Sequence, residues 1–202
     1  MMGLLFLLAG AELKAQTYEV YISNEALTSS TQMEFDVFIR STGATAAWPL
    51  RTYQCGYQFS SSFVNGGTLS GQYVSASSDL TEAGFGKTWA FTWNAANNVL
   101  NQSANTGNTC PGALIGSTAR KIGRFRVTNT ATWGCANDNI TIKSSGSGFL
   151  VLAITKWNSL DCSDAGNTII TSGATAYTAT PNASLLSASA SAPATTTCGN
   201  KD

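Results

Sequence analysis

The chain has 202 residues, equal numbers of acidic and basic side chains, and no histidine. A balanced charge argues against nucleic acid or an anionic membrane as the main partner, since both require a basic excess. Without histidine, Ser-His-Asp and Cys-His catalysis and nearly every catalytic zinc site are excluded. Charged residues are only 11% of the chain, and this scarcity, together with abundant Ser, Thr, Asn and Gly, favours short strands joined by turns.

An apolar run occupies residues 3–13 and leads into Lys14-Ala15-Gln16. The run is too short to span a bilayer as a helix, and Ala15 is a suitable small residue for cleavage. We therefore expect residues 1–15 to be a signal peptide, with no membrane insertion after its removal. The mature chain is then secreted and extracellular, in association with the cell surface. A buried N-terminal strand is the alternative for this run.

Apolar residues in the body of the chain recur with a period of two, which is the period of a strand. Residues 33–40 show it most clearly, with Met33, Phe35, Val37 and Ile39 on one face. The predicted strands cover residues 18–22, 33–40, 53–59, 68–75, 88–93, 122–128, 140–143, 149–157 and 168–171. This pattern predicts an all-β fold in which residues 16–177 form a single antiparallel β-sandwich of about nine strands.

The C-terminal part has the composition of a linker. Residues 178–197 are rich in Ser, Ala and Thr, contain two prolines and carry no charge. Residues 198–202 then begin what we expect to be a truncated further region. A natural disordered tail is the alternative.

Five cysteines in an exported chain indicate disulfides. The preferred bridge joins Cys110 to Cys135, across the predicted strand 122–128. Cys55 lies on the inward face of its strand and is expected to be a small buried apolar residue, whereas Cys198 is expected to pair beyond this chain. A cysteine metal site is not expected, because the sequence has no C-x-x-C spacing.

Three short segments carry a family resemblance. They are Phe35-Asp36-Val37-Phe38 followed by Ser41-Thr42-Gly43, then Gly56-Tyr57-Gln58-Phe59, then residues 122–129 with the sequence IGRFRVTN. With the Ala15-Gln16 junction, they resemble cohesin-like β-sandwiches of exported surface proteins from Bacteroidetes-type bacteria. The resemblance implies a jelly-roll-like sandwich in a modular protein exported by the type IX route. It also implies a protein or polysaccharide ligand, and it carries no catalytic residues.

Three tryptophans are the first candidates for ligand contact. Trp48, Trp133 and Trp157 stand at loop or strand ends, where we expect them to be exposed and able to stack on sugars. End-of-strand tryptophans that close the core are the alternative reading.

A second aromatic set lies on one strand. Trp89, Phe91 and Trp93 share a face at intervals of about 7 Å, which suits either a sugar platform or the core.

Three arginines are the second candidate site. Arg120, Arg124 and Arg126 are expected to project from the same side of one strand, where they can meet an acidic polysaccharide or a carboxylate-rich partner. A solvated strand face that discourages edge aggregation is the alternative.

No cofactor is expected. Two oxygen-rich segments, Asn137-Asp138-Asn139 and Asp161-Cys162-Ser163-Asp164 with Asn167, are possible calcium loops, but neither matches a defined one. No pair of carboxylates stands in a recognisable catalytic context, so we expect no enzymatic activity.

These observations predict a non-catalytic secreted or cell-surface binding module that contacts polysaccharide or a partner protein through its loops or an open sheet face. The alternatives are a structural spacer or assembly subunit of a larger surface protein, and an accessory domain of an extracellular hydrolase.

Overall fold

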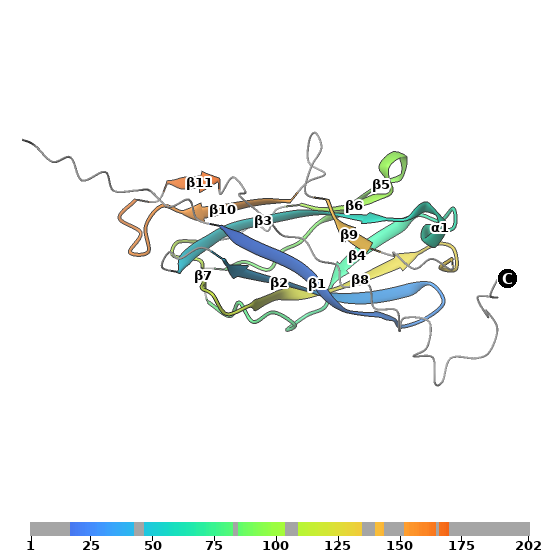
Figure 1. Cartoon of the computed structure of the whole chain (residues 1–202), viewed down its shortest axis with the longest axis horizontal. Coiled ribbons are helices and arrows are strands. Elements are labelled where there is room, and N and C mark those ends of the chain that lie inside the picture. The colour runs from blue at the N-terminus through green and yellow to red at the C-terminus, as the bar shows by residue number, and fades with distance from the viewer. Residues whose placement is uncertain are drawn as a thin grey trace, which may run out of the picture.

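The fold is described by a computed structural model that covers residues 17–42, 47–82, 85–103, 109–134, 140–143, 152–164 and 166–169. Its strands form two layers (Figure 1). The strands are β1 (Tyr18–Leu27), β2 (Gln32–Ser41), β3 (Trp48–Phe59), β4 (Leu69–Tyr73), β5 (Phe91–Asn94), β6 (Val99–Gln102), β7 (Ala113–Ile115), β8 (Arg120–Asn129), β9 (Ile140–Ile142), β10 (Ala153–Trp157) and β11 (Asn167–Ile169). The helical elements are one turn, α1 (Ser61–Val64), and the 3-10 turn η1 (Ala95–Asn97).

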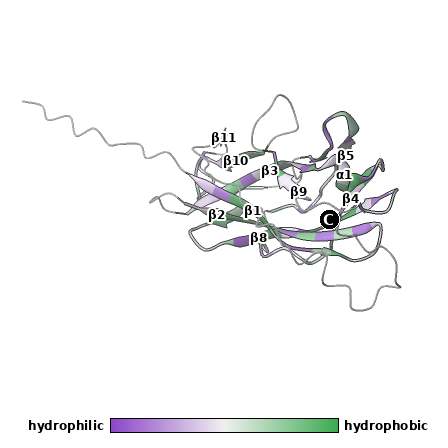
Figure 2. Cartoon of the chain, turned by 45° about the vertical axis from the view of Figure 1, so that its right-hand side comes forward, coloured by the Kyte–Doolittle hydropathy of each residue, from purple (hydrophilic) through white to green (hydrophobic). Residues whose placement is uncertain are grey.

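The first layer is a four-stranded sheet in the order β1-β2-β8-β4, with every neighbour antiparallel. The strands β1, β2 and β8 have ten residues each. They alternate apolar and polar residues, visible as green and purple bands in Figure 2. One face of this sheet is therefore buried and the other meets solvent.

The second layer is a seven-stranded sheet built around β3. Its main order is β11-β10-β3-β6-β5, and β7 and β9 also pair with β3. Because β3 has twelve residues, it takes two short partners along each edge: β10 and β9 on one side, β7 and β6 on the other. The longest strand thus holds together six elements that are distant in sequence.

The core lies between the two sheets. Phe35 from β2 meets Tyr57 from β3 across the layers, with ring centroids 5.0 Å apart. The predicted inward set of β2 is confirmed, since Met33, Phe35, Val37 and Ile39 are all fully buried. Cys55 is also fully buried, as expected from its strand face.

The antiparallel β-sandwich is confirmed, but the expected strand count is too low. The described residues contain eleven strands, and the sequence pattern missed β6 and β7. With four and three residues, these strands are too short to show a period of two. The predicted signal peptide, linker and C-terminal region (residues 1–15, 178–197 and 198–202) lie outside the described residues.

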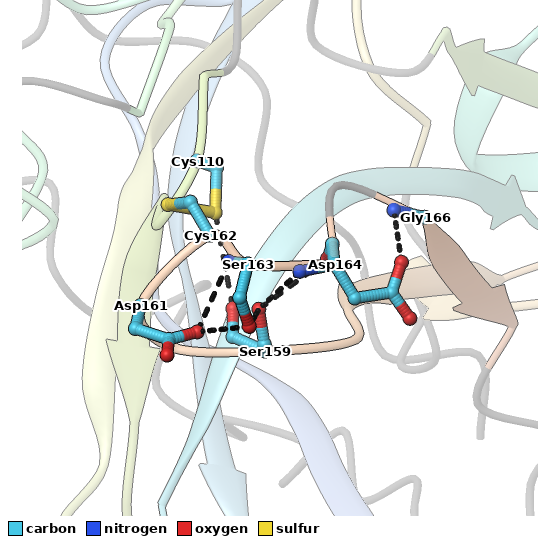
Figure 3. Close-up of a disulfide and its surroundings, with 7 residues drawn as sticks. All are labelled: Cys110, Ser159, Asp161, Cys162, Ser163, Asp164 and Gly166. Atoms are coloured by element: carbon cyan, nitrogen blue, oxygen red, sulfur yellow. Dashed lines mark hydrogen bonds between the residues drawn. A yellow bond between two sulfur atoms is a disulfide. The ribbon is translucent and has the colours of Figure 1, made fainter.

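The expected Cys110–Cys135 bridge is wrong. Cys110 bonds to Cys162 (Figure 3), and Cys135 lies outside the described residues. The pairing follows from the sheet, because Leu50 of β3 has Ala113 of β7 on one side and Lys156 of β10 on the other. The disulfide joins the segment before β7 to the loop after β10, so it clamps both flanks of β3 at this end of the sandwich.

Candidate binding surface

The solvent-facing side of the four-stranded sheet gathers most of the charged strand residues. Alternation along β2 points Glu34 and Asp36 outward, opposite Arg126 and Arg124 of β8. We call this surface the charged face. Its outward side chains include Glu19 and Tyr21 from β1, Glu34, Asp36, Phe38 and Arg40 from β2, Gln72 from β4, and Lys121, Arg124 and Arg126 from β8.

Ion pairs cross the strands of the charged face. The Nε atom of Arg124 lies 2.6 Å from a Glu34 oxygen, and its Nη1 atom lies 3.1 Å from Asp36. Arg126 places its Nη2 atom 2.7 Å from the other Glu34 oxygen. The amide of Asn24 donates to Asp36 at 2.8 Å. Each carboxylate therefore has at least two donors, which fixes the guanidinium groups in place.

This network changes the pKa values of two of its members, Glu34 and Arg124. Partial burial raises the pKa of Glu34, but the hydrogen bonds from Arg124 and Arg126 outweigh it and hold the pKa below its ordinary value. Desolvation lowers the pKa of Arg124, and its contacts with Glu34 and Asp36 outweigh that effect and raise it. Glu34 and Arg124 are therefore both ionised at neutral pH.

Cations and carboxylates occupy different depths of the charged face. The side chains of Arg40, Lys121, Arg124 and Arg126 are 24–46% exposed, whereas those of Glu19, Glu34 and Asp36 are only 6–17% exposed. The carboxylates lie beneath and the basic groups lie above them. A partner that approaches this sheet therefore meets a cationic layer, although the charges nearly balance.

An aromatic pair interrupts the charges. The rings of Tyr21 and Phe38 stack across β1 and β2, with centroids 5.2 Å apart and planes 12° from parallel. Phe38 is directly opposite Lys121 on its other side. This pair gives the charged face a small apolar contact area beside its cations.

The amino-acid sequence matches no protein-family model and no curated protein. The solved structures that align with the fold include type II cohesin modules. One, from a cohesin–X-dockerin complex of Acetivibrio cellulolyticus, has a TM-score of 0.46 at 10% identity, over 80% of this chain and 94% of its own. Another, from Bacteroides cellulosolvens, has a TM-score of 0.40 at 10% identity, over 68% and 85%. Similarity at this level assigns neither a family nor a partner to the chain.

Arg120 is not on the charged face, contrary to expectation. The pairing of β8 with β2 shifts between Val37 and Phe38, so that Lys121 is opposite Phe38 and Arg120 is opposite the buried Ile39. Such a bulge exchanges the faces of the residues beyond it. Lys121 thereby joins the other cations of the charged face, which the sequence pattern did not predict.

Arg120 instead ties a loop to the end of the sandwich. Its guanidinium pairs with Glu82 and donates to the carbonyl oxygens of Asp79 at 2.6 Å and Leu114 at 2.8 Å. Burial raises the pKa of Glu82, but the hydrogen bonds from Arg120 outweigh it and lower that pKa. With these internal partners, Arg120 holds the segment around Asp79 and Glu82 against Leu114 of β7.

The expected exposure of the three tryptophans is also wrong. Trp48, Trp133 and Trp157 are only 1%, 8% and 7% exposed. Trp133 stacks on Phe63 with ring centroids 4.5 Å apart, and the guanidinium of Arg51 lies 4.6 Å from the ring centroid of Trp157. Large rings close the open ends of the sandwich, so these side chains complete the core and offer no free face for stacking on a sugar.

The other aromatic set also belongs to the interior. Trp89 and Phe91 pack against Phe125 of the opposite sheet, with centroids 5.8 Å and 5.7 Å away, and Trp93 packs against Phe59. Of the two readings for this set, the core is the one the structure favours.

In the loop after β10, carboxylates accept hydrogen bonds from backbone N–H groups of the same loop (Figure 3). Asp161 accepts from the Ser163 backbone at 3.0 Å and Asp164 accepts from Gly166 at 2.8 Å. Within the described residues, no three His, Cys, Asp or Glu side chains group as a metal site. The segment 137–139 and the side chain of Asn167 lie outside the described part.

The outer face of the seven-stranded sheet differs from the charged face. At its centre β3 presents Thr52, Gln54 and Gln58, β6 presents Asn101, and β5 presents Thr92, all of them uncharged. The two sides of the sandwich therefore offer a partner different chemistry, and one serves as a control for the other.

Over the described ranges, no helix is long and apolar enough to cross a bilayer.

Proposed function

We propose that this chain is an exported, non-catalytic module that attaches a partner protein through the charged face. The observation that carries the proposal is the layering of exposed cations over buried carboxylates on a rigid sheet. Such an arrangement presents oriented donors without the cost of ordering them on binding. Electrostatic complementarity of this kind gives an interface its specificity and a fast association rate.

Two features support an extracellular setting. The Cys110–Cys162 disulfide is of a kind that persists in oxidising compartments and is rare in the cytosol. The apolar N-terminal run with Ala15 has the features of a signal peptide.

A protein partner is favoured over polysaccharide by the aromatic side chains. Stacking on sugars needs an exposed ring face, and the three candidate tryptophans are buried in the core. On the charged face, the rings of Tyr21 and Phe38 stack on each other, so each covers one face of the other. Aromatic and arginine side chains side by side are typical of protein–protein contact regions.

The test uses two exposed glutamines as matched positions for a photo-crosslinking residue. Gln72 of β4 stands beside Arg126 on the charged face, and Gln58 of β3 stands on the opposite sheet. Each labelled chain is irradiated with the exported proteins of the source organism, and adducts are identified by mass spectrometry. We expect one dominant protein adduct from position 72 and none from position 58.

Charge reversal supplies the second arm of this test. Arg126→Glu should abolish the adduct from position 72, because it removes an exposed cation and adds repulsion. Adducts from position 58 alone, or equally from both positions, would place the interface elsewhere and contradict the proposal.

A further inference from the structure

Three cations form a row along β8. Arg124 and Arg126 are two residues apart on one face of the strand, which separates them by about 7 Å. The bulge near Ile122 brings Lys121 onto the same face, opposite Phe38. Lys121, Arg124 and Arg126 are 26%, 24% and 41% exposed, so solvent reaches each of them. We call these three residues the basic row.

Some hydrogen-bond donors of the basic row are not used by the carboxylates beneath it. Arg124 uses its Nε and Nη1 atoms for Glu34 and Asp36, and Arg126 uses Nε and Nη2 for Glu34. Within the described part of the chain, Nη2 of Arg124 and Nη1 of Arg126 have no partner. Among the described residues, the Lys121 ammonium has one ion-pair partner, an oxygen of Asp36 at 4.0 Å. The carboxylates beneath therefore orient these groups while leaving hydrogen-bond capacity for a second anion.

We propose that the basic row binds an extended acidic segment of a protein, with carboxylates at alternate positions. This inference rests on the proposed function and names the chemistry of its partner. A peptide in strand conformation places every second side chain on one face, at the same interval of about 7 Å as Arg124 and Arg126. Its carboxylates can therefore meet successive cations in register, and charge-assisted hydrogen bonds form without strain on either chain.

The pairing of Tyr21 and Phe38 agrees with a peptide occupant. This apolar patch begins where the basic row ends, at Lys121. A peptide can place an apolar side chain there after its acidic residues, because its side chains vary along one backbone. An acidic polysaccharide repeats one polar unit and has no such group.

The probe is a fluorescein-labelled peptide of about eight residues in which Glu and Thr alternate, long enough at about 3.3 Å per residue to span the row. Its control is an isomer of the same composition with Glu and Thr in two blocks. An oligogalacturonate represents acidic polysaccharide. Binding of each peptide to the full chain is followed by fluorescence anisotropy. Binding of the oligogalacturonate is measured by its competition with the labelled alternating peptide.

Two double variants carry the same loss of charge. Lys121→Gln with Arg126→Gln alters the basic row and leaves Arg124 to hold Glu34 and Asp36. Lys143→Gln with Lys156→Gln alters residues that follow or belong to strands of the other sheet. Urea unfolding of both variants checks that each is folded.

We expect the alternating peptide to bind at least about tenfold more tightly than the block isomer, since only the former meets the cations in register. The basic-row variant should lose about tenfold or more, as expected for two charge-assisted contacts, and the control variant less than about twofold. Equal binding of the two isomers, or equal losses in the two variants, would overturn the inference.

Tighter binding of oligogalacturonate than of the peptide, lost in the same variant, would also overturn it and identify a polysaccharide site. If the crosslink from position 72 is found while the alternating peptide shows no preference, the acidic segment is wrong and the proposed function stands. If position 58 alone gives adducts, the proposed function itself is wrong.

Discussion

Glu34 is the residue on which the charged face depends most, because its two oxygens hold Arg124 and Arg126 together. Its pKa is lower in the folded chain than the ordinary value of 4.5. Ionised Glu34 therefore stabilises the fold fully above about pH 4.5, and this contribution is lost as the pH falls through the lower folded pKa. Glu34→Gln should weaken the dependence of the unfolding free energy on pH in this acidic window, measured by urea unfolding.

Glu25 is a control for Glu34, because its pKa is shifted in the opposite direction. Burial raises its pKa above the ordinary 4.5, so the folded chain loses stability as the pH rises through this region. Glu25→Gln should remove that loss and make the protein relatively more stable at neutral pH. If Glu34→Gln and Glu25→Gln change the pH dependence in the same direction, the assigned titrations are wrong.

Cys55 offers a second test at the scale of the residue. The thiol lies between Tyr53 and Tyr57 on the inward face of β3, and burial raises its pKa to about 12. A chain with Cys135→Ser and Cys198→Ser retains Cys55 as its one thiol outside the disulfide. Maleimide should leave this folded chain unlabelled at about pH 8 and label it in denaturant, because the thiolate is the reactive form. Rapid labelling of the folded chain would contradict the described packing.

At the scale of the element, β4 and β5 approach closely where the two sheets meet. A side chain at Gly71 would place its Cβ atom against the ring of Phe91, well inside van der Waals contact. Gly71→Ala should therefore destabilise the protein by about 1–3 kcal/mol, as overpacking does. Gly116→Ala is the matched control, since its nearest neighbour is 3.8 Å away, and should change stability by less than about 0.5 kcal/mol. Similar unfolding midpoints for the two variants would contradict this contact.

The disulfide gives a prediction about how loops are joined to β3. Cys110 and Cys162 close a loop with a sequence separation of 52, so Cys162→Ser should cost roughly 2–4 kcal/mol of stability. Peptide mapping without reduction should recover the Cys110–Cys162 pair, and recovery of a Cys110–Cys135 peptide would contradict the structure.

The period-two alternation of the sequence was sufficient to predict the long strands and insufficient to predict the site. Alternation in residues 33–40 predicts a strand with one buried face, and the structure places that strand as β2. The bulge that moves Lys121 onto the charged face and Arg120 off it depends on pairing with β2, which one strand's sequence does not contain. The burial of Trp133 likewise depends on Phe63, some 70 residues away in the chain.

The acidic partners of the arginines were predictable in part. Glu34 and Asp36 alternate on one strand as Arg124 and Arg126 do on another, and such complementary sets are a signal for strands that lie side by side. The disulfide was not predictable in this way, because it requires knowing that β7 and β10 flank the same stretch of β3.

At the scale of the whole molecule, the sandwich has one charged sheet face and one face whose centre is uncharged, with its ends closed by tryptophans. This asymmetry is what a module needs to engage a partner from one side while the rest of its surface stays free. The central claim is that the charged face is the side that binds.

Chemical-shift mapping by NMR tests this most directly. The uniformly labelled chain is titrated with the alternating Glu-Thr peptide, and the backbone amide shifts are followed residue by residue. We predict the largest changes on β2 and β8, around Glu34, Lys121 and Arg126, with little change on β3, β6 or β10. The largest changes on those three strands would contradict this claim, whereas the absence of any saturable change would contradict the acidic segment alone.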